Sequence, residues 1–124
     1  MSNFLGIGND IIEIKRIKKA CKNHEAAFID RVFTQKEQEY CNQFKDPYPY
    51  YAARFCAKEA IAKALRCGIG KNLAWTDIEI THDSNKRPLA VLSEKAHRHF
   101  NNPKIHVSLS HSKEYASAIA IWTD

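Results

Sequence analysis

Apolar and polar positions alternate along much of the 124-residue chain and divide it into short segments. Phe4 to Ile12 is apolar apart from Asn9 and Asp10, which is typical of a buried strand that ends in a polar turn. Four later segments alternate or run apolar in the manner of strands: 75–82, 89–92, 105–110 and 115–122. The last two flank a short polar turn and therefore predict a C-terminal hairpin.

Helical patterns fill most of the remaining chain. They occupy 15–22, 25–44, 50–66 and, after a capping serine, about 94–100. Thr34 and Glu37 form a capping-box pattern, which indicates a second helix start inside 25–44. Helices and strands follow one another without regular βαβ alternation, so the sequence predicts an α+β fold. We expect one domain over residues 1–124, with a mostly antiparallel sheet packed on helices.

Composition places the chain among ordinary globular proteins. No apolar run approaches the roughly 20 residues needed to span a bilayer, and the N-terminus lacks the features of a signal peptide. We therefore expect a cytoplasmic protein without a membrane partner. The four cysteines contain no CxxC pair, which favours reduced, partly buried thiols over a zinc site or disulfides: Cys21, Cys41, Cys56 and Cys67.

The formal net charge of +5 suits a nucleic acid, a phosphorylated ligand or an acidic protein as partner. Residues 15–22 carry five cations in eight positions and no acid. This segment is either a docking surface for an anionic partner or a solvated helix face balanced by distant acids. No aromatic residue interleaves with its cations, and no motif of a nucleic-acid-binding domain is present, which argues against nucleic acid.

Two carboxylates, those of Asp10 and Glu59, are candidates for a functional site. Asp10 lies within an apolar segment after Gly6 and Gly8, and it is either a turn residue or a metal ligand. The glycines would let another backbone or a phosphate approach closely. Glu59 and Lys63 lie four residues apart on the helix at 50–66, where they form either a plain salt bridge or part of a site. Asp10 and Glu59 together would suit Mg²⁺ if the fold brings them together.

His111 ends a strand whose neighbouring positions carry alternating serines, Ser108 and Ser110 among them. A Ser–His nucleophile pair is conceivable, although no GxSxG motif is present. The alternative is a hydrogen-bonded structural or surface histidine. The other histidines show no HExxH or comparable metal-binding spacing.

Three blocks of the chain resemble the signature motifs of bacterial holo-acyl-carrier-protein synthases: residues 6–17, residues 54–64 with Gly68-Ile69-Gly70 after them, and residues 107–112. They occur in the family's order and cover nearly the whole chain. The resemblance implies the 4'-phosphopantetheinyl transferase fold and the transfer of the phosphopantetheine arm of coenzyme A to a serine of apo-acyl carrier protein. The implied reaction releases adenosine 3',5'-bisphosphate, and the holo-acyl carrier protein that it forms supports fatty acid biosynthesis. The resemblance also implies Mg²⁺ and a homotrimer with active sites at subunit interfaces.

The resemblance further implies roles for eight residues. Asp10 and Glu59 would hold the metal, Lys63 would contact the phosphates, Ser110 and His111 would lie in the coenzyme A site, and Arg16, Lys19 and Lys22 would dock the carrier protein. Asp10, Glu59 and Lys63 would form the catalytic group. The general base stays open between a metal-bound water, Glu59 and Asp10.

One departure from the family lies in the turn at 83–88. Many members carry a glycine just before its proline, where this chain has Arg87. A rival function is a non-enzymatic basic domain that binds nucleic acid or an acidic protein, with Glu59 and Lys63 as a plain salt bridge. The two functions differ in geometry, because only the enzyme requires Asp10 close to Glu59.

Overall fold

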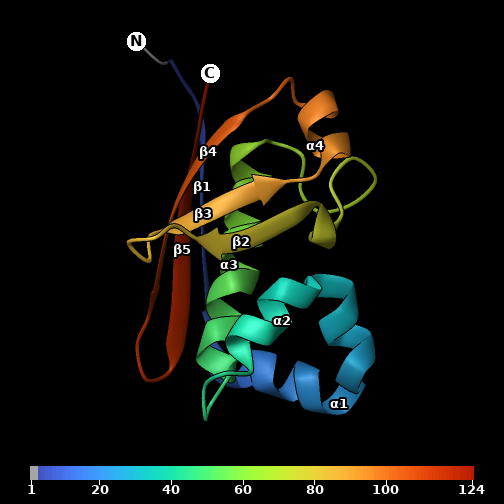
Figure 1. Ribbon diagram of the computed structural model, residues 1–124, viewed down its shortest axis with the longest axis vertical. Coiled ribbons are helices and arrows are strands. Elements are labelled where there is room, and N and C mark those ends of the chain that lie inside the picture. Colours follow the sequence, from blue (N-terminus) through green and yellow to red (C-terminus); the bar gives the residue numbers. More distant parts are fainter. Residues whose placement is uncertain (1–2) are drawn as a thin grey trace.

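The computed structural model describes residues 3–124, with the backbone alone at residues 24 and 25. Its elements follow in this order: β1 (Phe4–Glu13), α1 (Ile14–Val32), α2 (Gln35–Cys41), α3 (Tyr48–Ala64), a 3-10 turn η1 (Trp75–Asp77), β2 (Ile78–His82), β3 (Pro88–Leu92), α4 (Glu94–His99), β4 (Lys104–His111) and β5 (Tyr115–Thr123). Figure 1 shows α3 running along the long strands, with α1 and α2 gathered at one end and α4 at the other.

The strands form two antiparallel sheets rather than one. β5 lies between β1 and β4 in the larger sheet, and β2 pairs with β3 in the smaller one. Asp10 of β1 and Leu109 of β4 both stand opposite Ala118 of β5. The predicted α+β class and antiparallel pairing are therefore confirmed, and the C-terminal hairpin is formed by β4 and β5.

The predicted capping box is present and divides the helical region. The Thr34 hydroxyl accepts a hydrogen bond from the Glu37 amide, and the Glu37 carboxylate accepts one from the Thr34 amide, at 3.3 and 2.9 Å. α1 ends just before Thr34, and α2 begins after it. The predicted break between 22 and 25 is wrong, because α1 continues through these residues. Residues 75–77 form η1 instead of the start of a strand.

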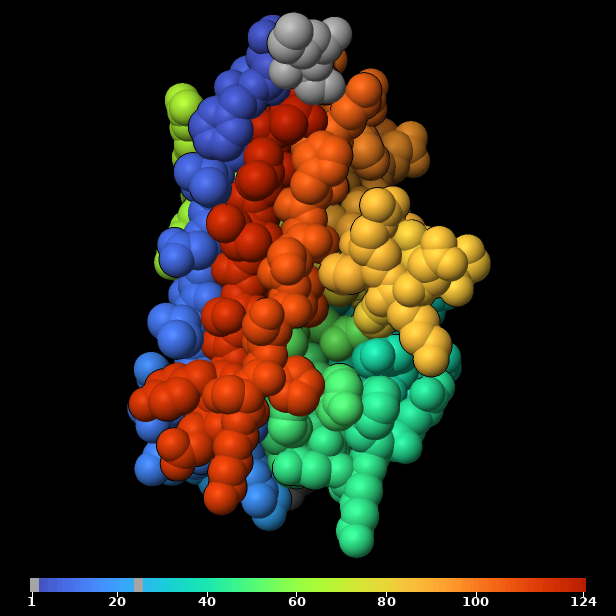
Figure 2. Space-filling view, turned by 90° about the vertical axis from the view of Figure 1, so that its left-hand side faces the viewer, coloured from blue at the N-terminus to red at the C-terminus, as the bar shows by residue number. Residues whose placement is uncertain are grey.

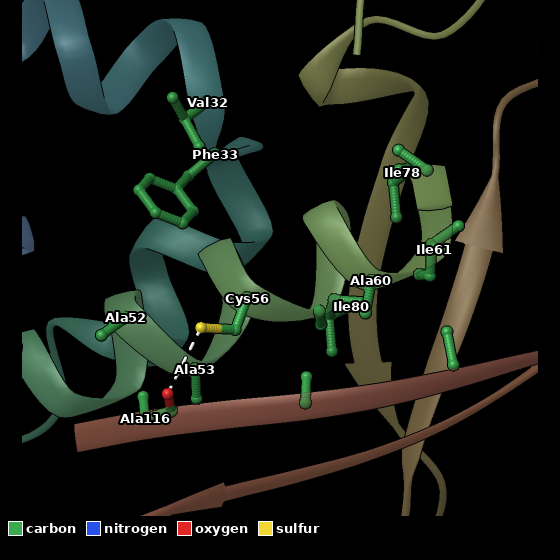
Figure 3. Packing of buried hydrophobic residues seen from close by; sticks show 14 of the residues in the cluster. Val32, Phe33, Ala52, Ala53, Cys56, Ala60, Ile61, Ile78, Ile80 and Ala116 are labelled. Atoms are coloured by element: carbon green, nitrogen blue, oxygen red, sulfur yellow. Dashed lines mark hydrogen bonds between the residues drawn. The ribbon is translucent and has the colours of Figure 1, made fainter. Parts of the chain in front are cut away.

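α3 is the central element of the core. Most of its residues from Tyr51 to Ala64 are buried, and small side chains let neighbouring elements come close (Figure 3). A Cβ atom at Gly6 would stand 2.1 Å from the carbonyl oxygen of Ala64, and one at Gly8 would stand 2.1 Å from that of Ala60. Only glycine fits there, so the two residues bring β1 directly against α3, as the sequence predicted for a close backbone approach.

Lys58 and Glu37 form a buried ion pair that the sequence analysis did not foresee. The Lys58 ammonium lies 2.6 Å from the Glu37 carboxylate and also donates to the carbonyl oxygens of Val32 and Trp75, at 2.6 and 3.1 Å. The second Glu37 carboxylate oxygen accepts a hydrogen bond from the Ile80 amide at 2.8 Å. This pair links α3 to the end of α1, to α2, to η1 and to β2, and so fixes the orientation of α3.

The cysteines agree with the predicted reduced state. Cys21, Cys41 and Cys56 are buried, and Cys67 is exposed, so only the last departs from the expected partial burial. Burial raises the pKa of Cys56 to about 12, which keeps this thiol protonated and unreactive. The Cys56 thiol donates to the carbonyl oxygen of Ala116 at 3.5 Å (Figure 3). None of the described helices combines the length and apolar character that crossing a membrane requires.

Candidate functional site

Asp10, Glu59 and Lys63 come together where β1 meets α3, and we call them the Asp10 cluster. The Lys63 ammonium lies 3.3 Å from the Asp10 carboxylate and donates to the Asn9 carbonyl oxygen at 3.0 Å. Within residues 3–124, Lys63 forms no ion pair with Glu59, so the plain i,i+4 salt bridge, one of the two alternatives for these residues, is absent and a contact across two elements takes its place. Burial raises the pKa of Glu59, and the nearby Asp10 charge raises it further, against the opposing effect of Lys63.

The local structure explains why these three side chains meet. Side chains of a strand alternate between its faces, so Asp10 lies on the same face as Gly8, toward α3. Gly8 touches α3 at Ala60 and beside Lys63. Glu59 and Lys63 are one turn apart on that helix, which places both next to the strand. The Asp10 side chain is 20% exposed, so it is sheltered but reachable from solvent.

The donors of the Asp10 cluster fit a magnesium ion. Mg²⁺ is usually held by one or two carboxylates together with waters and substrate phosphates. Asp10 and Glu59 supply two such carboxylates, and the mutual repulsion that raises the pKa of Glu59 would be offset by a divalent cation. Among the described residues no three His, Cys, Asp or Glu side chains are grouped to hold a metal ion, so further ligands would have to come from substrate and water.

Ser110 and His111 line a different hollow, which we call the Arg54 cavity. It has a volume of about 180 Å³. The elements that contribute to it are α2, α3, the β2–β3 hairpin and the end of β4. Its lining residues are Tyr40, Tyr50, Ala53, Arg54, His82, Lys86, Pro88, Leu109, Ser110 and His111. The rings of Tyr50 and His111 meet edge to face, with centroids 5.2 Å apart.

Arg54 gives this cavity its chemistry. The residue is 3% exposed, its guanidinium lies 4.2 Å from the centre of the Tyr40 ring, and one nitrogen donates to the Tyr50 carbonyl oxygen. The Nε and Nη2 atoms are buried, and neither has a hydrogen-bond partner within the described part of the chain. Leaving a buried charged donor unsatisfied is costly, so the arrangement favours an anion in the cavity.

The other lining groups agree with an anion site. No carboxylate is among the described residues that line the cavity. Burial and the charge of Arg54 lower the pKa of His82, whose ring lies tilted against that of Tyr40 with the ring centroids 4.7 Å apart. The sequence analysis quoted Arg54 within a motif and assigned it no role. An arginine inside a helix of small and apolar residues was the signal that could have found it.

The Asp10 cluster and the Arg54 cavity are separate within one chain. Asp10 lies on β1 and His111 on β4, with β5 between them, which corresponds to about 10 Å between these outer strands. Along α3, Lys63 stands 13 residues after Tyr50, or about 20 Å. None of the cluster residues lines the cavity. The structure therefore unites Asp10, Glu59 and Lys63, and it brings Ser110 and His111 to a second place.

The basic residues of α1 lie on the surface. Arg16 and Lys19 line a shallow depression of about 320 Å³ with Ala20 and Asn23. Lys22 is exposed on the same helix. Among the side chains that the structure describes, which exclude those of residues 24 and 25, none forms an ion pair with these three cations.

Residues 6–120 match the 4'-phosphopantetheinyl transferase superfamily. The chain belongs to this superfamily. Among relatives within it, the holo-[acyl-carrier-protein] synthase of Chlamydia caviae is 51% identical over 115 residues, which are 93% of each chain. The synthase of Protochlamydia amoebophila is 45% identical over 119 residues, covering 96% of this chain and 98% of that relative.

Solved structures of the superfamily share the fold. The Helicobacter pylori holo-[acyl-carrier-protein] synthase in complex with coenzyme A has a TM-score of 0.86 at 36% identity, over 94% of this chain and 98% of that one. The Neisseria meningitidis enzyme has a TM-score of 0.90 at 30% identity, over 97% and 98%. These likenesses confirm the resemblance found in the sequence and the predicted phosphopantetheinyl transferase fold.

Proposed function

We propose that the chain transfers the 4'-phosphopantetheine arm of coenzyme A to a serine of apo-acyl carrier protein, which gives holo-acyl carrier protein and adenosine 3',5'-bisphosphate. Relatives named for this activity match nearly the whole chain, and a similar structure holds coenzyme A. The observation that carries the proposal is the Asp10 cluster, in which two carboxylates and an ammonium from β1 and α3 meet at one partly exposed place.

In this proposal the serine oxygen bonds to the β-phosphorus of coenzyme A while the bond to the bridging oxygen breaks. Asp10 and Glu59 would hold Mg²⁺, which when bound offsets negative charge on the pyrophosphate oxygens. Lys63 is 53% exposed, so its ammonium can move from Asp10 to the departing phosphate and stabilise the charge that develops there. We assign the role of proton acceptor for the serine to the Glu59 carboxylate, which lies in the same cluster as Asp10 and Lys63.

The carrier protein would dock on α1. The exposed cations Arg16, Lys19 and Lys22 suit an acidic partner, because complementary charge speeds association and fixes orientation. We place the reaction in the cytoplasm, in support of fatty acid biosynthesis, and assign it to one domain spanning residues 1–124.

The proposal includes a homotrimer with each active site shared between subunits. The separation of the Asp10 cluster from the Arg54 cavity within one chain supports the trimer, since the cluster of one subunit and the cavity of a neighbouring subunit could form one active site. The outer face of β1 and β5 is a second support. Figure 2 shows β1, β5 and β4 side by side on a face that no helix covers. Ile7, Ile11 and Ile119 are exposed there, Ile11 by 67%, and such apolar patches mark protein interfaces.

The direct test is a mass measurement. Apo-acyl carrier protein incubated with the chain, coenzyme A and Mg²⁺ should gain the mass of one phosphopantetheine arm. We expect Glu59→Gln to lose this transfer, and Glu39→Gln, at an exposed position of α2, to retain it. Absence of a mass gain with the unmodified chain would contradict the proposed function, and full turnover of Glu59→Gln at low Mg²⁺ would contradict the role of Glu59.

A further inference from the structure

The turn between β2 and β3 is held together by one aspartate. The Asp83 carboxylate accepts hydrogen bonds from the amides of Asn85 and Arg87, at 2.8 and 2.9 Å. The Asp83 amide in turn donates to the carbonyl oxygen of Arg87 at 2.9 Å. The Arg87 guanidinium lies 3.3 Å from the same carboxylate. This ring of contacts orders the turn and keeps the side chain of Arg87 on Asp83.

Lys86 is the unusual residue of this turn. Its φ is 66°, in the left-handed region where L-residues other than glycine, asparagine and aspartate are uncommon. This backbone conformation is one that glycine adopts without strain, so Lys86 is the position of the turn at which a side chain is costly. A residue kept in a sparsely populated backbone conformation often serves a function, because the surrounding structure must hold it there.

Lys86 lines the Arg54 cavity and also a neighbouring hollow of about 460 Å³. Figure 2 shows the hairpin turn, in gold, projecting beside β4. Among the side chains that the structure describes, the ammonium of Lys86 has no ion-pair partner, whereas Arg87 next to it is paired with Asp83. Arg87 thus stabilises the turn itself, and the Lys86 ammonium is available to a ligand.

Lys86 and Arg54 together make a site for a phosphate dianion. The guanidinium is buried with two unused donor atoms, and the ammonium borders the same cavity on a flexible stem. His82 and His111 line the cavity as well, and no carboxylate among the described residues opposes an anion there. Charge-assisted hydrogen bonds to a phosphate are among the strongest available to a side chain.

We infer that Lys86 is a specificity-determining residue that contacts the 3'-phosphate of coenzyme A in the Arg54 cavity and makes the chain prefer coenzyme A to dephospho-coenzyme A. The inference rests on the proposed function. The pyrophosphate must reach the Asp10 cluster, where its bond breaks, and no residue of that cluster lines the cavity. The 3'-phosphate is the remaining phosphate of the donor, and it is the group that dephospho-coenzyme A lacks.

The test compares donors and products in three variants. We expect Lys86→Gly to lower kcat/KM for coenzyme A about tenfold and to leave kcat/KM for dephospho-coenzyme A unchanged, because one charge-assisted contact is lost. Its Tm should stay equal or rise by up to about 3 °C, since glycine relieves the left-handed strain. Lys86→Arg should keep the preference, and Arg87→Gln, which changes the paired cation of the same turn, should leave it unaltered.

Calorimetry separates this inference from the proposed function. Lys86→Gly should weaken binding of adenosine 3',5'-bisphosphate about tenfold and binding of adenosine 5'-monophosphate hardly at all. An unchanged ratio of the two affinities would overturn the role of Lys86, whether or not the chain transfers the arm. If the unmodified chain transfers no arm but Lys86→Gly lowers its affinity for adenosine 3',5'-bisphosphate relative to adenosine 5'-monophosphate, the proposed reaction is wrong and the phosphate contact of Lys86 is supported.

Discussion

Two lysines of α3 stand five residues apart, and each faces a carboxylate, yet their surroundings differ. Lys58 is 0% exposed and its ammonium has three acceptors, from Glu37 and two backbone carbonyls. Lys63 is 53% exposed and lies at the longer distance of 3.3 Å from Asp10. Burial lowers the pKa of Lys58, and the charge of Glu37 opposes this effect. Lys58 is therefore enclosed by protein, whereas Lys63 is partly open to solvent.

The difference shows how to separate a structural ion pair from a functional one. A buried pair with satisfied neighbours contributes to stability only while both partners are present. An exposed pair contributes little to stability, because water and salt compete for both charges. A lysine that is weakly held can exchange its partner for a substrate phosphate. Mutations at the two positions should therefore act on different measurable quantities.

The largest effect is expected for Lys58→Met. It leaves the Glu37 carboxylate buried without a counter-charge, which should lower the free energy of unfolding by about 3–5 kcal/mol. Urea unfolding followed by circular dichroism measures this loss. The matched change Lys63→Met should cost less than about 1 kcal/mol. Equal losses at the two positions would end the distinction between the lysines.

The second effect concerns turnover. Lys63→Gln should reduce kcat for arm transfer by about 100-fold, because the departing phosphate loses its ammonium partner. The free energy of unfolding should change by less than about 1 kcal/mol. Lys36→Gln, at an exposed position on α2, is a control for the loss of one surface charge. A variant at Lys63 that turns over normally, or that unfolds at much lower urea concentration, would contradict the assigned role.

The smallest effect is expected for His82, whose burial lies between those of the two lysines. Burial and Arg54 lower its pKa, while Asp83 acts in the opposite direction. The Tyr40 ring lies against the imidazole, and Lys86 lines the same cavity. Because the folded state disfavours the charged imidazole, its contribution to stability is complete above pH 6.5, the ordinary histidine pKa. That contribution is lost as the pH falls through the lowered value.

A series of Tm measurements between pH 5 and 7.5 tests this sign, over a range that spans the ordinary histidine pKa of about 6.5. His82→Gln should show a shallower fall of Tm on acidification than the unmodified chain. Identical slopes for the two proteins would mean that the cation at this position is tolerated as well in the folded chain as in the unfolded one.

Local patterns in the sequence predicted the elements that depend on local interactions. The Thr34 capping box correctly indicated a new helix, because both of its hydrogen bonds join residues three apart. Residues 23 and 24 did not end α1, because asparagine and histidine are poor helix formers but do not break a helix. Ile17 and Cys21 before them are buried in the core, and tertiary packing outweighs such weak preferences.

Contacts between distant residues were beyond the sequence patterns. Glu37 was predicted as a capping residue, but its pairing with Lys58, 21 residues away, depends on how α2 packs against α3. The i,i+4 rule offered a salt bridge between Lys63 and Glu59 as one alternative, whereas the carboxylate that Lys63 contacts comes from a strand 53 residues away. Asp10 and Glu59 could be singled out as candidates because a carboxylate in an apolar setting is visible in the sequence, whereas only the fold brings the charge of Asp10 to bear on Glu59.

Gly6 and Gly8 have a consequence for how this protein tolerates change. Their missing side chains set the gap between β1 and α3, and any methyl group would meet a carbonyl oxygen at 2.1 Å. Relief of that overlap requires the helix to move by about 1 Å, since carbon and oxygen normally stay more than 3 Å apart. Displacements of that size at reacting groups cost about 100-fold in rate. A mutant at Gly6 or Gly8 that still folds would therefore lose most of its activity. Selection for activity, rather than for stability alone, keeps glycine at both positions.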